Sequence, residues 1–124
     1  MQLSCPVSIG EVLDKISILR IKQERIKDPG KLAHIRKELD LLTKLIGDAR
    51  EYEPFLKELH EHNSALWDLE DAIRLKEKNQ QFDADFIALA RSVYKTNDKR
   101  FEVKNRVNQK YNSAIQEQKS YEKY

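Results

Sequence analysis

Residues 7–32 read VSIGEVLDKISILRIKQERIKDPGKL, a stretch that holds a helix start, an apolar stripe and a second helix start. Ser8 can accept a hydrogen bond from the first amides of a helix, and Glu11 can return one, which is the capping-box pattern. Asp28 before Pro29 repeats the signal, because Asp is a favoured N-cap and Pro is tolerated at the first helical position. The turn between them is short, so an antiparallel pair of helices is predicted.

The apolar residues of the first helix recur at helical spacing until about Ile26. They are Ile9, Val12, Leu13, Ile16, Leu19 and Ile26. Ile18 and Ile21 point away from this stripe. They lie on a neighbouring face near Gly10 and Ser17, and small residues seven apart permit a close helix approach. This face therefore predicts a second contact, with another helix or with another subunit.

A second and a third helix follow from similar signals. The second stripe ends before Gly47, which is suited to a left-handed C-cap, and consists of Leu32, Ile35, Leu39, Leu42 and Ile46. A polar stretch then leads to Pro54, the predicted first residue of the third helix, which fades over residues 76–81. The third stripe consists of Phe55, Leu56, Leu59, Leu66, Trp67 and Ile73.

A fourth, long helix begins after Asp83, its predicted N-cap, and Phe82 is placed to pack back onto Ile87. Its stripe consists of Phe86, Ala90, Val93, Tyr94, Phe101, Val107, Tyr111 and Ile115. Residues 96–98 are weak helix formers. The stripe keeps its phase across them, so one continuous helix is predicted. A polar tail, expected to fray, follows from about residue 117.

The fold predicted from these patterns is an all-α up-down bundle of about four amphipathic helices in two hairpins, as one domain over residues 1–124. Only three Gly and three Pro occur, too few for the turns of a β-sandwich. The 35% of charged residues suits helices with a wide face in water. The longer hairpin must overhang the shorter one, and its exposed apolar surface predicts a homodimer.

Composition also indicates which kinds of binding partner and which cellular compartment to expect. The formal net charge is +2, which gives no support to a nucleic-acid partner. A basic row on the fourth helix lies opposite the core stripe, where a solvated face is expected, and consists of Arg91, Lys95, Lys99, Arg106 and Lys110. The lone Cys5 excludes an internal disulfide, and no apolar run approaches the ~20 residues of a membrane span. A cytoplasmic protein without a membrane partner is expected.

No metal or cofactor is predicted. His60 and His62 point roughly 160° apart on a helix, so they cannot chelate one ion. The sequence also contains no Gly-rich phosphate loop, no nucleophile elbow and no clustered Cys/His set.

Several polar residues fall on or beside the apolar stripes, where an unpaired polar group is costly. The predicted ligand-binding set consists of Arg20, Glu70, Arg74, Asn97, Arg100, Lys104 and Asn108, with Asn63 also on the core face. Three interpretations stay open. In the first, Glu70 pairs with Lys104 or Arg100 and the asparagines cross-link the helices. In the second, the groups line a cavity for a small anionic ligand. In the third, a kink at Asn97 turns these groups out to water. If the site were catalytic, Glu70 is the candidate general base, as the one acid placed on the core face.

Three segments together resemble a family of small bacterial and phage proteins known only as a domain of unknown function. They are residues 7–32, Trp67-Asp68-Leu69-Glu70-Asp71 with Arg74, and Ala90-Arg91-Ser92-Val93-Tyr94-Lys95-Thr96-Asn97-Asp98 with Arg100, Lys104 and Asn108. The resemblance implies that Glu70, Asp71, Arg74, Asn97, Asp98, Arg100 and Lys104 belong to one recurring pattern. It implies no activity.

Two functional hypotheses follow. The first is a domain that binds, or acts on, an anionic metabolite in a polar pocket between the helices. The second is a structural or protein-interaction module that oligomerises or docks a partner through Ile18 and Ile21, without catalysis. A nucleic-acid surface on the basic row ranks third.

Overall fold

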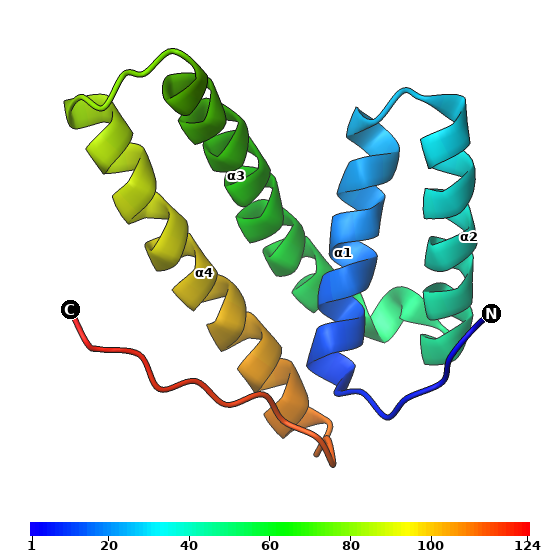
Figure 1. The fold of residues 1–124 in the computed structure, drawn as a ribbon. Helices are drawn as coiled ribbons and strands as arrows, with labels where there is room; N and C mark the ends of the chain where they lie inside the picture. Colours follow the sequence, from blue (N-terminus) through cyan, green and yellow to red (C-terminus); the bar gives the residue numbers. More distant parts are fainter.

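The computed structural model describes residues 1–124 and contains four α-helices, one short 3-10 helix and no strand. The elements are α1 (Ile9–Arg25), α2 (Pro29–Ile46), η1 (Ala49–Tyr52), α3 (Glu53–Lys78) and α4 (Ala84–Lys110). α1 and α2 form one antiparallel hairpin, α3 and α4 form a longer one, and the two hairpins diverge toward the end that carries both turns (Figure 1). The predicted all-α architecture of two hairpins is confirmed. None of these helices has the length and apolar character that a membrane crossing requires.

Side chains cap three of the four helices at their N-termini, as the sequence predicts. Ser8 accepts a hydrogen bond from the amide of Glu11 at 3.2 Å, and Asp28 accepts one from Lys31 at 2.9 Å. Asp83 accepts one from Phe86 at 3.0 Å. α3 begins differently, because η1 occupies the stretch predicted as an irregular connection and runs directly into it.

The C-terminal ends of α3 and α4 use left-handed residues other than glycine. Gln80 has φ 54° and Asn112 has φ 48°. The amide of Ser113 donates back to the carbonyl of Asn108 at 2.8 Å, so the end of α4 is a Schellman motif. α4 is continuous through residues 96–98, as predicted. The prediction that it carries Tyr111 and Ile115 is wrong, because the left-handed turn at Asn112 ends it at Lys110.

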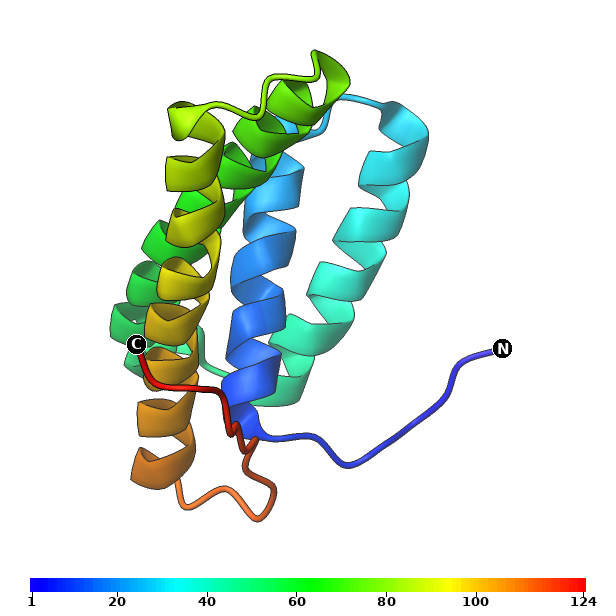
Figure 2. The same cartoon turned by 60° about the vertical axis from the view of Figure 1, so that its left-hand side comes forward.

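α1 is the central helix of the molecule and is buried on two faces (Figure 2). One face packs on α2 and the other on α3 and α4. The second face is the one predicted from Gly10 and Ser17. A Cβ atom at Gly10 would lie 2.6 Å from the carbonyl oxygen of Lys104, so only glycine permits this approach of α1 to α4. The buried apolar core consists of Val12, Leu13, Ile16, Leu56, Leu59, Val103 and Val107.

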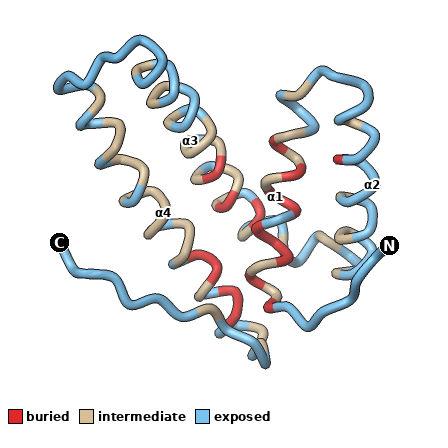
Figure 3. Tube along the Cα trace, in the orientation of Figure 1, coloured by how far each residue is buried: buried red, intermediate tan, exposed pale blue.

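Burial is confined to one end of the long hairpin (Figure 3). We call α1 with residues 53–63 and 100–110 the base, and residues 64–78 with 84–99 the open half. No residue of the open half is buried, and the predicted stripe residues Leu66, Trp67, Ile73, Phe86, Ala90 and Val93 are only half-buried. The overhang predicted from helix length explains this, because α1 has 17 residues whereas α4 has 27. The Phe82 ring, which is predicted to pack back onto Ile87, lies edge-on against Phe86, and both Phe82 and Ile87 are exposed.

Candidate functional site

A buried carboxylate, Asp14 of α1, organises the polar groups of the base. Its side chain is fully buried and accepts hydrogen bonds from the Nε and Nη2 atoms of Arg100, the first at 2.9 Å. The amide of Asn63 donates to the same carboxylate at 2.9 Å and to the hydroxyl of Ser17 at 3.2 Å. The hydrogen bond to Asp14 raises the pKa of Arg100, and a two-pronged bond of this kind fixes the guanidinium plane. One acid therefore joins α1, α3 and α4.

Lys104 lies beside this carboxylate with its side chain only 8% exposed. Its Nζ donates to Glu11 and to Glu117, each at 2.8 Å, and lies 3.9 Å from Asp14. Burial acts to lower the pKa of Lys104, but the hydrogen bonds to the two glutamates and the negative charges of Asp14 and Glu11 together outweigh it, so the pKa is raised. The Glu11 carboxylate therefore pairs with Lys104. The prediction that it accepts a hydrogen bond at the N-terminus of α1, as in a capping box, is wrong.

Asn108 locks the register of α4 against α1. Its side-chain oxygen accepts a hydrogen bond from the amide of Gly10 at 2.7 Å, and the residue is 1% exposed. Every buried side-chain nitrogen and oxygen of the molecule has a hydrogen-bond partner. The base is thus a fully paired polar network inside an apolar core.

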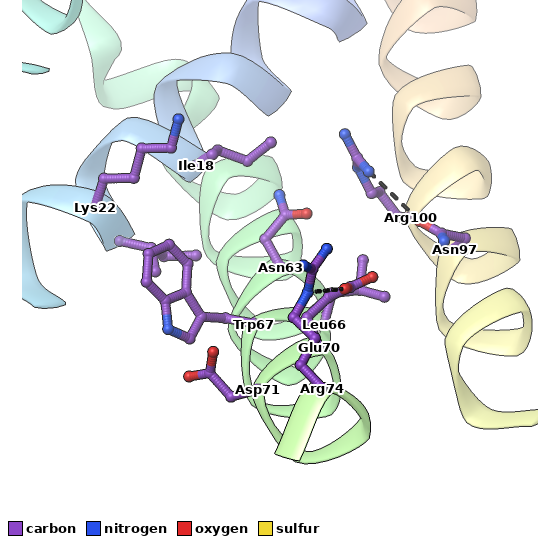
Figure 4. A pocket seen from close by; sticks show the side chains of 11 residues that line it. Ile18, Lys22, Asn63, Leu66, Trp67, Glu70, Asp71, Arg74, Asn97 and Arg100 are labelled. Atoms are coloured by element: carbon purple, nitrogen blue, oxygen red, sulfur yellow. Dashed lines mark hydrogen bonds and ion pairs between the residues drawn. The ribbon is translucent and has the colours of Figure 1, made fainter. Parts of the chain in front are cut away.

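A groove opens directly above this network, where the two hairpins diverge (Figure 4). Its volume is about 490 Å³, which is within the usual range of small-molecule sites. α1 contributes Ile18 and Lys22 on one side, and α4 contributes Arg100 on the other. The residues of α3 between them are Asn63, Leu66, Trp67, Glu70, Asp71 and Arg74. The groove is therefore a mixed surface, with an apolar wall and several charged groups.

The predicted site residues fall into three places. Glu70, Arg74, Asn97 and Arg100 line the groove. Lys104 and Asn108 lie in the paired network of the base and do not line it. Arg20 belongs to neither group, because it forms an exposed ion pair with Glu53 at 3.1 Å, on a different face of α1.

The predicted environment of Glu70 is wrong. It is exposed and bonds to Nε of Arg74 at 3.1 Å, not to Lys104 or Arg100. The buried acid is Asp14, so the argument that singled out Glu70 as a general base no longer applies. Helical phase did not indicate Lys22 or Asp71, which also line the groove; Asp71 entered only through the family resemblance. Trp67 was placed on an apolar stripe, and the same position makes it a wall of the groove.

The side chains that commonly bind metal ions do not cluster in this structure. No group of three or more His, Cys, Asp or Glu side chains is placed to hold an ion. His60 instead lies 3.6 Å from Glu24 on the surface.

The fold and the groove together define a class: small all-α proteins in which two unequal helical hairpins share a buried polar network and diverge above it. Over residues 3–124 the chain matches the model of DUF6165, which is described as a family of unknown function. The chain belongs to this family, and the resemblance to a domain of unknown function is confirmed. No curated protein and no solved structure shows significant similarity.

Proposed function

We propose that the protein binds a small organic anion in the groove. A carboxylate or phosphate group would lie against Arg100 and Arg74, and a flat or apolar body would lie against Trp67. The observation that carries this proposal is the state of Arg100. Its guanidinium is held rigidly by the buried Asp14, yet it lies at the groove wall. A donor that is fixed before the ligand arrives loses little entropy on binding.

Unpaired donors in the groove favour an anion over a cation. Nη1 of Arg100 has only a long contact, 3.4 Å, to the Asn97 oxygen. Arg74 uses Nε for Glu70 and leaves both terminal nitrogens without a protein partner. Lys22 forms no ion pair with the protein although it lines the groove. Planar guanidinium groups with free N–H bonds are suited to carboxylate and phosphate oxygens.

The small contribution of the buried Asp14–Arg100 ion pair to stability gives further support to a binding role for Arg100. Burying an ion pair contributes little net stability, because the loss of hydration offsets most of the attraction. An apolar pair of similar volume would hold α1 against α4 at least as well. A buried acid whose main partner faces a groove is therefore better suited to positioning that arginine than to stability.

The test is a thermal-shift panel of sugar phosphates, nucleotides and dicarboxylates. A ligand at about 100 times its Kd should add about 2.7 kcal/mol to the free energy of unfolding. Arg74→Gln should abolish the shift, because the exposed Arg74 contributes to the ligand site but not to the core. Arg106→Gln is the matched control, since Arg106 also pairs with a glutamate at 2.8 Å but lies outside the groove. A panel without a hit, or hits that both variants weaken equally, would contradict the proposal.

A second candidate, a homodimer without a ligand, has its own support. The open half and the α3–α4 turn expose the large apolar side chains of Leu75, Phe82 and Ile87. Ile21, one of the two residues expected on a docking surface, is 1% exposed and belongs to the core, so the contact would form at the turn instead. Light scattering of the purified protein tests this: the mass of a dimer should fall to that of a monomer in Ile87→Glu. A monomeric wild-type protein would contradict it.

A further inference from the structure

Residues 113–124, which we call the tail, run back along α4 after it ends (Figures 1 and 2). The carboxylate of Glu117 accepts a hydrogen bond from Lys104 at 2.8 Å. Further along, the hydroxyl of Tyr124 donates to Asp98 at 2.7 Å, and the Tyr124 ring packs edge-on against Tyr94 with centroids 5.1 Å apart. The tail is thus anchored at both ends.

The anchors lie on one face of α4. Tyr94, Asp98, Phe101 and Lys104 are spaced by four, three and three residues, so they form a single stripe on the helix. Phe101, in the middle, receives the Lys119 ammonium over its ring at 5.1 Å. We call these four residues the α4 strip. It offers a cation at one end, aromatic rings along its length and a carboxylate near the other end.

Beyond Ser113, the tail is held on the α4 strip by side chains alone. No backbone hydrogen bond joins residues 114–124 to the rest of the chain. Tyr124 stays 75% exposed although it is docked. Contacts of this kind contribute modest free energy, so the tail is readily displaced.

Glu117 is not needed to balance the charge of the site. Without it, Arg100 and Lys104 already face two carboxylates, Asp14 and Glu11. With it, three carboxylates surround two cations. The place that Glu117 occupies beside Lys104 is therefore one that an acid from another chain can take.

We propose that the α4 strip is a binding surface for an extended peptide that presents a carboxylate and, seven residues further on, a phenol. The tail is the built-in competitor for this surface. The carboxylate pairs with Lys104, the phenol hydroxyl donates to Asp98, and the ring packs on Tyr94. The partner is an acidic, tyrosine-bearing extended segment of another protein, and the groove between the hairpins plays no part in holding it.

The expected affinity follows from tethering. A short flexible connection gives the tail an effective concentration on the order of 1 mM. If the free peptide binds with a Kd of about 100 µM, the tethered tail weakens the apparent binding of an added peptide by about tenfold. Substitutions that release the tail from the α4 strip should remove this competition and so strengthen the binding of the added peptide by the same factor.

The experiment measures the fluorescence anisotropy of a labelled peptide with the sequence of residues 113–124. It is titrated with the wild-type chain and with the full chain carrying Glu117→Gln and Tyr124→Ala, two positions that lie outside the apolar core. The peptide should bind the double variant about tenfold more tightly. Adding Asp98→Ala to that variant should weaken binding at least fivefold, whereas adding Arg106→Ala, on the opposite face of α4, should not.

Three results would overturn the proposal. The first is the absence of binding to the double variant at peptide concentrations up to about 1 mM. The second is equal affinity for the wild-type chain and the double variant. The third is unchanged affinity for a peptide that itself carries Gln and Ala at its first acid and its last tyrosine. Circular dichroism of each variant confirms that a loss of binding is not a loss of fold.

Discussion

The base and the open half share the helices α3 and α4, yet they differ in what covers these helices. In the base, α1 lies against both α3 and α4, and their facing side chains exclude water. In the open half, α3 and α4 lie mainly against each other. The end of α1 and the tail reach them only through exposed contacts, such as Arg25 with Asp68 and Tyr124 with Asp98, and no side chain there is buried. Two helices in contact bury one stripe each, whereas a third helix closes the space between them. The comparison separates the part that specifies the fold from the part that is free to bind.

Asp14→Ala should have the largest effect on the base. It leaves Arg100 and Asn63 without their shared partner, and breaking a buried pair in this way costs about 3–5 kcal/mol. Urea denaturation followed by circular dichroism measures the change. Asp71→Ala, an exposed acid at the groove, should stay within about 0.5 kcal/mol. If the two variants were equally stable, the polar network would not organise the base.

Leucine truncations compare the two regions with the same chemical change. Leu59 in the base is 0% exposed, and Leu59→Ala should cost roughly 3 kcal/mol. Leu75 in the open half is 59% exposed, and Leu75→Ala should cost no more than about 0.5 kcal/mol. The midpoints of thermal unfolding give both values. A large cost at Leu75 would mean that a partner, such as a second copy, covers the open half in solution.

Glycine substitutions test the close approach inside the base. The Cβ of Gly10→Ala meets backbone, the Lys104 oxygen at 2.6 Å, so the helices must separate at a cost of about 1–3 kcal/mol. Gly30→Ala is the control, because its nearest neighbour is the Asp28 side chain at 3.5 Å. That substitution should be neutral or stabilise α2 by up to about 1 kcal/mol. A Gly10→Ala variant as stable as Gly30→Ala would show that α1 and α4 are loosely packed.

The smallest expected effect is a dependence on alkaline pH. Because the pKa of Lys104 is raised in the folded protein, its contribution is fully present below its ordinary pKa near 10.4 and is lost as pH rises through the folded value. Urea unfolding at pH 8 and pH 11 should show this loss in the wild type and not in Lys104→Met. The pKa of Lys76, at the α3–α4 turn, is also raised, mainly by its hydrogen bond to Asp83. The ion pair of Lys76 with Asp83 lies at the surface and contributes little to stability, so Lys76→Met should keep the wild-type profile.

Local chemistry made much of the fold predictable. The caps at Ser8, Asp28 and Asp83 depend on bonds within four residues, so their sequence signals need no knowledge of the rest of the chain. The overhang follows from helix length alone. The end of α4 was missed because Asn112 takes a left-handed turn, which asparagine permits but does not require.

The candidate site was harder to predict because it depends on which helix is central. Asp14 lies opposite the main stripe of α1, between Gly10 and Ser17 along the chain, where an acid ordinarily faces water. The two small residues indicated a second contact, but not that it would bury the acid between them. Lys104 and Asn108 were correctly placed toward the interior, yet their partners lie on α1 and the tail, and helical phase within α4 cannot specify them.

The bond between the Gly10 amide and Asn108 has a consequence for how the chain folds. Its two residues are 98 positions apart, so it closes a loop of nearly the whole chain. Each hairpin, by contrast, joins helices that adjoin in sequence, and such local pairs form quickly. We therefore expect both hairpins to form early and the meeting of α1 with α4 to limit the folding rate, because loop-closure entropy is lost at that step. In stopped-flow kinetics, Gly10→Ala should slow refolding and leave the unfolding rate nearly unchanged.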